Sequence, residues 1–238
     1  MITLALPKGR LAKDLGPILD HAGLALEPAY FDESDRRLIY TTDNPNVRVV
    51  PIKPFDVATI VATGGANLGI VGADVVAEFD YSELYVPISF PFGPCRLSVA
   101  GPKGFMMPKA GETVRVASKY PNLTRRFFHR RGINLTLIPM SGALELAPHL
   151  GLADCIVDLV STGATLRAND LVECEVILES SARLVVGRQA YQTGGGELHS
   201  LLGRFLDLTS GLASGPEPEA LPSAKAMATG PAVEPVAA

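Results

Sequence analysis

The chain has 238 residues, of which 47% are hydrophobic, enough apolar material for one large domain or two small ones. A formal net charge of -4, from 21 basic and 25 acidic residues, excludes the general attraction to polyanions that is typical of nucleic-acid-binding proteins. The 3 cysteines are widely spaced without a CxxC motif, and no segment has the length of a signal peptide core or a membrane span, so we expect a soluble cytoplasmic protein without zinc, disulfide framework or membrane contact.

The first half of the chain alternates short β-branched segments with helical patterns. Strands are expected at ITLAL (2–6), RLIYTT (37–42), VRVVPI (47–52) and LGIVG (68–72), and helices at about 11–21 and 54–62. This alternation is typical of an α/β fold with buried strands.

The second half repeats the alternation after PISFPFGPC (87–95), whose Pro and Gly content predicts a hinge or crossover. Strands are expected at 96–101, 113–118, 134–139 and 154–160, and helices near 122–131 and 142–149. A last strand, ARLVVG (182–187), precedes a helix at about 197–208, and we expect this strand to complete the first sheet. The prediction is therefore two α/β lobes with mixed sheets and a central cleft: domain I at 1–90 plus 182–210, domain II at 91–181, and a disordered Ala/Pro-rich tail at 211–238.

Two aspartates lie in an otherwise apolar run, ELAPHLGLADCIVDLV, directly before a loop rich in hydroxyls. Asp154 and Asp158 are four residues apart, so a strand or a helix would direct both to the same face. The loop from Ser161 to Thr165 offers hydroxyls and backbone N–H groups that could wrap a phosphate. Two interpretations stay open on these residues alone: a sugar-phosphate site, or an ordinary strand–helix turn whose aspartates pair with arginines.

The wider pattern resembles the signature of the ATP phosphoribosyltransferase family. Glu145, Gly151, Asp158, Thr162-Gly163 and Thr165-Leu166 have the spacing of that signature, and LALPKGRL, NPNVRV, LGIVGADVV, CRLSVAG and VASKYPNLTRRFF are similar to other family blocks. The resemblance extends to about Leu208. It implies transfer of the 5-phosphoribosyl group of phosphoribosyl pyrophosphate to N1 of ATP with release of pyrophosphate, the first step of histidine biosynthesis, with Mg²⁺ as cofactor.

The resemblance also implies roles for particular residues. Arg10 and Arg36 would stabilise the departing pyrophosphate as catalytic residues, a role that suits cations near a leaving group. Phosphoribosyl pyrophosphate would contact Lys8, Glu145, Asp154, Asp158, Ser161, Thr162, Gly163, Ala164, Thr165 and Leu166. ATP would lie near Lys53, which replaces a usual arginine, and near Asp74, Cys95 and Arg96. No metal ligand is assigned.

The same resemblance implies a short-form catalytic subunit. Such a subunit would pair with a regulatory protein related to histidyl-tRNA synthetase in a hetero-octamer, and would be a histidine-insensitive homodimer alone. Two rivals remain at this point. Two hinged α/β lobes also describe type II periplasmic binding proteins, and another phosphoribosyltransferase could act on a different nitrogen base. An assay with phosphoribosyl pyrophosphate, Mg²⁺ and ATP separates these alternatives.

Overall fold

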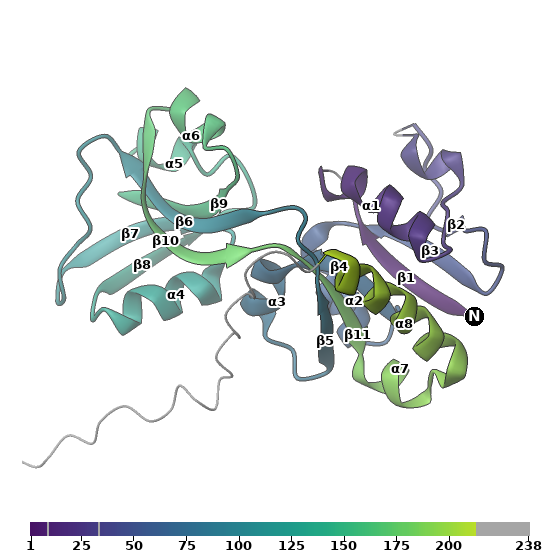
Figure 1. Cartoon of the computed structure of the whole chain (residues 1–238). Coiled ribbons are helices and arrows are strands. Elements are labelled where there is room, and N and C mark those ends of the chain that lie inside the picture. The colour runs from purple at the N-terminus through teal and green to yellow at the C-terminus, as the bar shows by residue number, and fades with distance from the viewer. Residues whose placement is uncertain (9, 33, 213–238) are drawn as a thin grey trace, which may run out of the picture.

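The computed structural model describes residues 1–8, 10–32 and 34–212. Two β-sheets, each covered by helices on both faces, form two lobes that lie side by side (Figure 1). The predicted two-lobed α/β architecture is therefore confirmed. The predicted tail lies outside the described residues except for 211 and 212, which belong to the last helix. In the described part of the chain, no helix combines the length and the apolar character needed to cross a membrane.

The first lobe, lobe I, is built on a six-stranded sheet in the order β2-β3-β1-β4-β11-β5. Its strands are β1 (Ile2–Pro7), β2 (Tyr40–Thr41), β3 (Val47–Ile52), β4 (Leu68–Gly72), β5 (Leu84–Ser89) and β11 (Ala182–Gly187). Strand β1 is parallel to β3 and β4, and it is buried at every position because helices cover both faces of the sheet. Helices α1 (Arg10–His21) and α8 (Gly195–Leu212) pack on one face, and α2 (Pro54–Ala62) and α3 (Ala73–Phe79) on the other. The short helices η1 (Pro28–Phe31) and α7 (Arg188–Thr193) complete the lobe.

The second lobe, lobe II, is built on a five-stranded sheet in the order β10-β6-β9-β7-β8. Its strands are β6 (Cys95–Pro102), β7 (Thr113–Ser118), β8 (Asn134–Pro139), β9 (Cys155–Val160) and β10 (Leu171–Ser180). Helix α4 (Pro121–Arg130) packs on one face, and α5 (Leu146–His149) and α6 (Ala164–Ala168) lie over the other (Figure 1). Strand β7 is parallel to β8 and β9, so the carboxyl ends of β7 and β9 meet at one edge of the sheet.

Strand β11 completes the first sheet, as the sequence predicted. It is antiparallel to both of its neighbours, β4 and β5, and lies between them. Two predicted elements are shorter than expected. The strand predicted at 37–42 is reduced to Tyr40–Thr41, and the helix predicted at 142–149 begins only at Leu146, because Ala143 has a φ of 52°, which a right-handed helix excludes.

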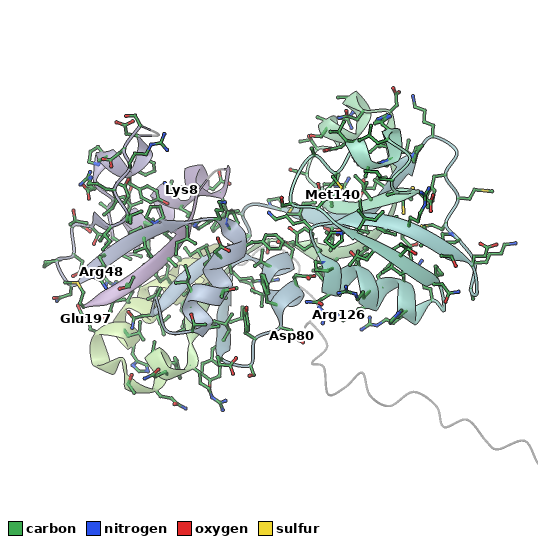
Figure 2. All side chains as sticks on the ribbon, turned by 180° about the vertical axis from the view of Figure 1, so that it is seen from behind. Lys8, Arg48, Asp80, Arg126, Met140 and Glu197 are labelled. Carbon is green, nitrogen blue, oxygen red and sulfur yellow. The ribbon has the colours of Figure 1, made fainter. Side chains whose placement is uncertain are left out.

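Two chain crossings connect the lobes, and the helices α3 and α4 are in contact across the junction between them. The crossings are residues 90–94, between β5 and β6, and Ser181, between β10 and β11. Glu78 of α3 is buried, and its carboxylate accepts hydrogen bonds from the backbone N–H groups of Asn122 and Leu123 at the start of α4, at 2.8 and 2.9 Å. These N–H groups have no partner inside their own helix, so a residue of lobe I caps a helix of lobe II. Asp80 and Arg126 form an ion pair at the same junction (Figure 2).

Candidate active site

Two pockets lie where parallel strands end. In open α/β sheets, ligands bind outside the carboxyl ends of the strands. The residues that directly follow β1, β7 and β9 line one pocket or the other, and so does Gly72, the last residue of β4. The loop pocket lies within lobe II, and the inter-lobe pocket lies between the lobes; Leu159 contributes to both.

The loop pocket has a volume of about 210 Å³ and gathers most of the residues predicted for phosphoribosyl pyrophosphate. It is lined by Glu145, Asp158, Leu159, Val160, Ser161, Thr162, Gly163, Ala164, Thr165 and Leu166. Gly163 has a φ of 71°, a backbone conformation that favours glycine and that turns the chain from β9 into α6. Exposed serine and threonine residues thus share a concave surface with two acidic residues.

Asp158 and Glu145 bring two negative charges to the loop pocket. The pKa of Asp158 is raised to about 6, mainly by burial. The Leu159 N–H and Lys119 lower this pKa, and the nearby carboxylates of Glu145 and Asp74 raise it. The Leu159 backbone N–H donates to Asp158 Oδ1 at 2.8 Å. A half-buried carboxylate beside a second one is stabilised by hydrogen-bond donors or by a cation, both of which a sugar phosphate with its metal ion supplies.

Asp154 does not join this pair. It lies just before β9, about 13 Å of extended chain from Asp158, and its side chain accepts hydrogen bonds from the Arg115 guanidinium at 2.6 Å and from the Arg115 backbone N–H at 2.8 Å. Arg115 holds the pKa of Asp154 below its usual range. The expectation that both aspartates serve one site is therefore corrected. Asp154 pairs with an arginine, as the alternative interpretation of the sequence had it, and only Asp158 lines the pocket.

Arg96 also lies elsewhere than expected, because successive side chains of a strand point to opposite faces. Cys95 lines the inter-lobe pocket, whereas the next residue, Arg96, forms a two-pronged ion pair with Glu173 of β10. Another nitrogen of its guanidinium donates to the Ser161 carbonyl at 3.3 Å, and the Ser98 hydroxyl donates to Glu173 at 2.7 Å. Arg96 therefore contacts the backbone of Ser161, the first residue of the 161–165 loop, and is not part of the wall that Cys95 lines.

The inter-lobe pocket has a volume of about 210 Å³ and contains three of the other predicted residues. Lys8, Asp74 and Cys95 line it together with residues of both lobes that were not predicted, among them Phe55, Tyr120 and Ser180. Lys119 also lines this pocket. Its ammonium lies 4.0 Å from the centroid of the Phe55 ring, a contact that joins lobe II to lobe I.

The Asp74 carboxylate is buried and accepts two hydroxyl donors. Ser180 Oγ donates to Oδ1 at 2.6 Å, and the Tyr120 hydroxyl donates to Oδ2 at 2.7 Å. Burial raises the pKa of Tyr120, and the Asp74 carboxylate raises it further, so the phenol keeps the proton that it donates. Asp74 thus has its hydrogen bonds within the protein, and no signal in the sequence around residue 74 could identify Tyr120 as its partner.

The remaining predicted residues belong to lobe I. Lys53 is exposed and precedes α2, next to Pro54, which lines the inter-lobe pocket. Arg36 is exposed in the segment before β2, and no hydrogen bond or ion pair joins its side chain to the described residues, whereas Arg37 pairs with Glu27 and Asp35. Arg10 begins α1, and its side chain lies outside the described part of the structure.

No group of three or more His, Cys, Asp or Glu side chains in the described residues is arranged to hold a metal ion by itself. Glu145 and Asp158 nevertheless share a pocket with the loop hydroxyls. Mg²⁺ is usually held by one or two carboxylates together with substrate phosphates and water, and this pair fits that pattern.

Comparisons with known proteins point to one family. Residues 53–207 match the family model described as HisG: ATP phosphoribosyltransferase. The chain is 48% identical over 207 residues to the ATP phosphoribosyltransferase of Novosphingobium aromaticivorans, with 86% of this chain and 93% of that relative covered. A chain of the ATP phosphoribosyl transferase (HisG:HisZ) complex from Thermotoga maritima is 32% identical, with a TM-score of 0.75 over 89% of this chain and 100% of that chain.

The fold is also similar to that of ligand-binding proteins of the type II periplasmic class. The alkanesulfonate-binding protein SsuA from Xanthomonas axonopodis pv. citri has a TM-score of 0.53 and 14% identity, over 87% of this chain and 72% of that chain. At that identity the similarity concerns the fold alone.

Proposed function

The chain belongs to the ATP phosphoribosyltransferase family, and from this membership we propose how its two pockets divide the reaction. The enzyme transfers the 5-phosphoribosyl group of phosphoribosyl pyrophosphate to N1 of ATP and releases pyrophosphate, the first step of histidine biosynthesis. A bond forms between the anomeric carbon and N1 while the bond to the pyrophosphate oxygen breaks. N1 attacks with a lone pair and carries no proton, so the reaction needs no general base at this atom.

The loop pocket holds the 5-phosphoribosyl end in this proposal. The observation that carries it is the gathering of Glu145, Asp158 and the whole run 161–166 around one concavity. The Ser161, Thr162 and Thr165 hydroxyls and the loop N–H groups suit the 5-phosphate. The Asp158 carboxylate suits the ribose hydroxyls, which are neutral donors, because an ionised carboxylate only accepts hydrogen bonds.

ATP enters from the inter-lobe side. Lys8 and Lys119 supply positive charge there, and Phe55 and Tyr120 supply aromatic surface. Arg10 and Arg36 are the proposed catalytic residues, because negative charge accumulates on the pyrophosphate oxygens as the glycosidic bond breaks and fixed cations stabilise it. Lys53 lies next to the pocket wall and adds a further cation, without the planar fork of an arginine.

Magnesium is the proposed cofactor. Glu145 and Asp158 are the residues that would hold it, jointly with the substrate. When bound, the ion would neutralise the charge of the pyrophosphate group. The chain's own contribution is to place two carboxylates at the ribose side of the pocket.

A regulatory partner is also part of the proposal. The Thermotoga maritima structure is a HisG:HisZ complex, and the chain covers 93% of the Novosphingobium relative. We propose that this chain is a short-form catalytic subunit that assembles with a histidyl-tRNA-synthetase-like protein as a hetero-octamer in the cytoplasm, and that it is a histidine-insensitive homodimer when alone. Strong histidine inhibition of the chain by itself would contradict this.

The direct test mixes the chain, with and without the regulatory protein, with phosphoribosyl pyrophosphate, Mg²⁺ and ATP. We expect formation of N1-(5-phosphoribosyl)-ATP and release of one pyrophosphate per turnover. Absence of product with the partner present, or turnover with another nitrogen base in place of ATP, would overturn the assignment of substrates.

A further inference from the structure

The Asp74 carboxylate links three parts of the molecule that are distant in sequence. It belongs to α3 of lobe I, it binds Tyr120 at the entrance to α4 of lobe II, and it binds Ser180 at the end of the strand that crosses between the lobes. The Asp74 backbone N–H also donates to Ser180 Oγ at 3.1 Å. Asp74 is only 3% exposed, so its interactions with the two hydroxyls are shielded from competing water.

The glycine at position 72 leaves room for the Asp74 carboxylate. A Cβ atom at Gly72 would lie 2.2 Å from Asp74 Oδ1 and 3.5 Å from Ser180 Oγ. The backbone conformation of Gly72 is an ordinary extended one, so steric room for the carboxylate, and not backbone flexibility, is what glycine provides here.

Tyr120 and the preceding residue, Lys119, contact the same aromatic ring of lobe I. The Tyr120 ring packs edge-on against Phe55, with centroids 4.9 Å apart, and the ammonium of Lys119 lies over the same Phe55 ring. In the parallel pairing of β7 and β9, Ser118 is opposite Val157, so the next residues along the two strands are Lys119 and Asp158. Lys119 therefore lies between the inter-lobe pocket and the carboxylate of the loop pocket.

We propose that Asp74 and Tyr120 are positioning residues for phosphoribosyl transfer, and that they act through Lys119 by holding its ammonium at the boundary between the two pockets. This inference rests on the proposed division of substrates, in which the bond to pyrophosphate breaks at that boundary. A fixed cation there stabilises the charge that develops on the leaving group. A displacement of about 1 Å can cost about a hundredfold in rate.

Tyr120→Phe is the most direct test, because it removes one hydroxyl and keeps the ring on Phe55. Assayed with the regulatory partner present, the variant is expected to lose about tenfold in kcat with KM for both substrates within about twofold, the pattern of an interaction that matters in the transition state. Tyr81→Phe is the matched control: the Tyr81 hydroxyl lies 3.1 Å from Thr59 Oγ1 inside lobe I. It removes a tyrosine hydrogen bond that does not join the lobes, and kcat should stay unchanged.

A double-mutant cycle separates positioning from general destabilisation. If Tyr120 acts through Lys119, Tyr120→Phe causes no further loss of kcat in a Lys119→Met background, since interacting residues give non-additive effects. Equal tenfold losses in both backgrounds, or an unchanged kcat in the single variant, would overturn the inference.

Gly72→Ala provides a second route if Tyr120→Phe does not fold. The added methyl group displaces the Asp74 carboxylate and leaves every hydroxyl in place, and its loss of kcat should again vanish in the Lys119→Met background. Failure of the proposed function is distinguishable from failure of this inference. In the first case the wild-type enzyme forms no product, and in the second it is fully active while the cycle is additive.

Discussion

The loop pocket and the inter-lobe pocket are similar in volume but differ in construction. Apart from Glu145, one continuous run, residues 158–166, lines the loop pocket, whereas the walls of the inter-lobe pocket come from many separate segments of both lobes. The loop pocket therefore keeps its shape whatever the orientation of the lobes. The inter-lobe pocket exists only while contacts such as Asp74–Tyr120 and Lys119–Phe55 hold the lobes together.

The largest expected effect tests whether lobe I supplies catalytic charge. Arg36→Ala should lower kcat roughly ten- to a thousandfold, the scale for losing one electrostatic contact to a developing anion. Arg37→Ala is the matched control, because Arg37 is paired with Glu27 and Asp35, and it should leave kcat unchanged. If Arg36→Ala keeps the wild-type kcat in steady-state kinetics, Arg36 is not a catalytic residue.

Gly163→Ala tests the loop pocket on its own. A non-glycine residue at the left-handed conformation costs roughly 1–2 kcal/mol, and the new Cβ would also lie 3.1 Å from the Arg167 guanidinium. The loop should shift, and KM for phosphoribosyl pyrophosphate should rise about tenfold or more while KM for ATP changes little.

Gly111→Ala is the control for that strain. Gly111 has a φ of 87° in a turn before β7, with nothing within 4 Å of an added Cβ. The two pockets are separable if both variants lose similar thermal stability and only Gly163→Ala has a raised KM for phosphoribosyl pyrophosphate. Parallel rises in both KM values would contradict them.

The pKa of Asp158, raised to about 6, predicts a pH dependence that belongs to the loop pocket. The carboxylate accepts hydrogen bonds only when ionised, so kcat/KM for phosphoribosyl pyrophosphate should fall as pH drops through 6, by about tenfold at pH 5. Asp158→Asn should be weakly active and should lack this change. An identical acidic limb in Asp158→Asn would assign the titration to another group, such as the substrate phosphate.

The effect on stability has the opposite sign. Because the folded-state pKa of Asp158 is raised, its favourable contribution is present below the ordinary carboxyl pKa and is lost as pH rises through about 6. Asp158→Asn should therefore have a higher Tm than the wild type at pH 8, and this difference should shrink toward pH 4.

The smallest effect is expected at Asp154. Asp154→Asn breaks an ion pair with Arg115 whose two side chains are 37% and 46% exposed, so the free energy of unfolding should fall by no more than about 1 kcal/mol. Both KM values should stay within about twofold of the wild type. A large rise in KM for phosphoribosyl pyrophosphate would return Asp154 to the substrate site.

The difference between the pockets also explains what could be predicted from sequence. The loop pocket was predictable because its residues are neighbours along the chain. In the inter-lobe pocket, only Lys8, Asp74 and Cys95 were predicted, and the family resemblance supplied them. Tyr120 and Ser180 are 46 and 106 positions from Asp74, and local patterns carry no information on such pairs.

The fold follows the same rule. Strand β4 has the predicted bounds because it is a continuous, almost wholly buried apolar run, and β3 and β11 have the predicted bounds because each is rich in β-branched and other apolar residues. Strand β10 (Leu171–Ser180) was not predicted, because its mixed polar and apolar side chains are largely half-buried or exposed and its pairing with β6 is interrupted by two register shifts. The partner of Asp154 could not be read from its spacing to Asp158, because Asp154 precedes β9 and pairs with Arg115 of the neighbouring strand β7, whereas Asp158 lies within β9.

Strand β11 lies between β4 and β5, yet the ribosome makes it only after all of lobe II. During synthesis, the edge of β4 in the first sheet stays unpaired until β11 has been made. The strands of the second sheet are consecutive in the chain, so that sheet can fold earlier. Long-range pairing of this kind is slow and leaves an open strand edge exposed to aggregation. Lobe II is thus expected to mature first on the ribosome, and lobe I to close around the last strand to emerge.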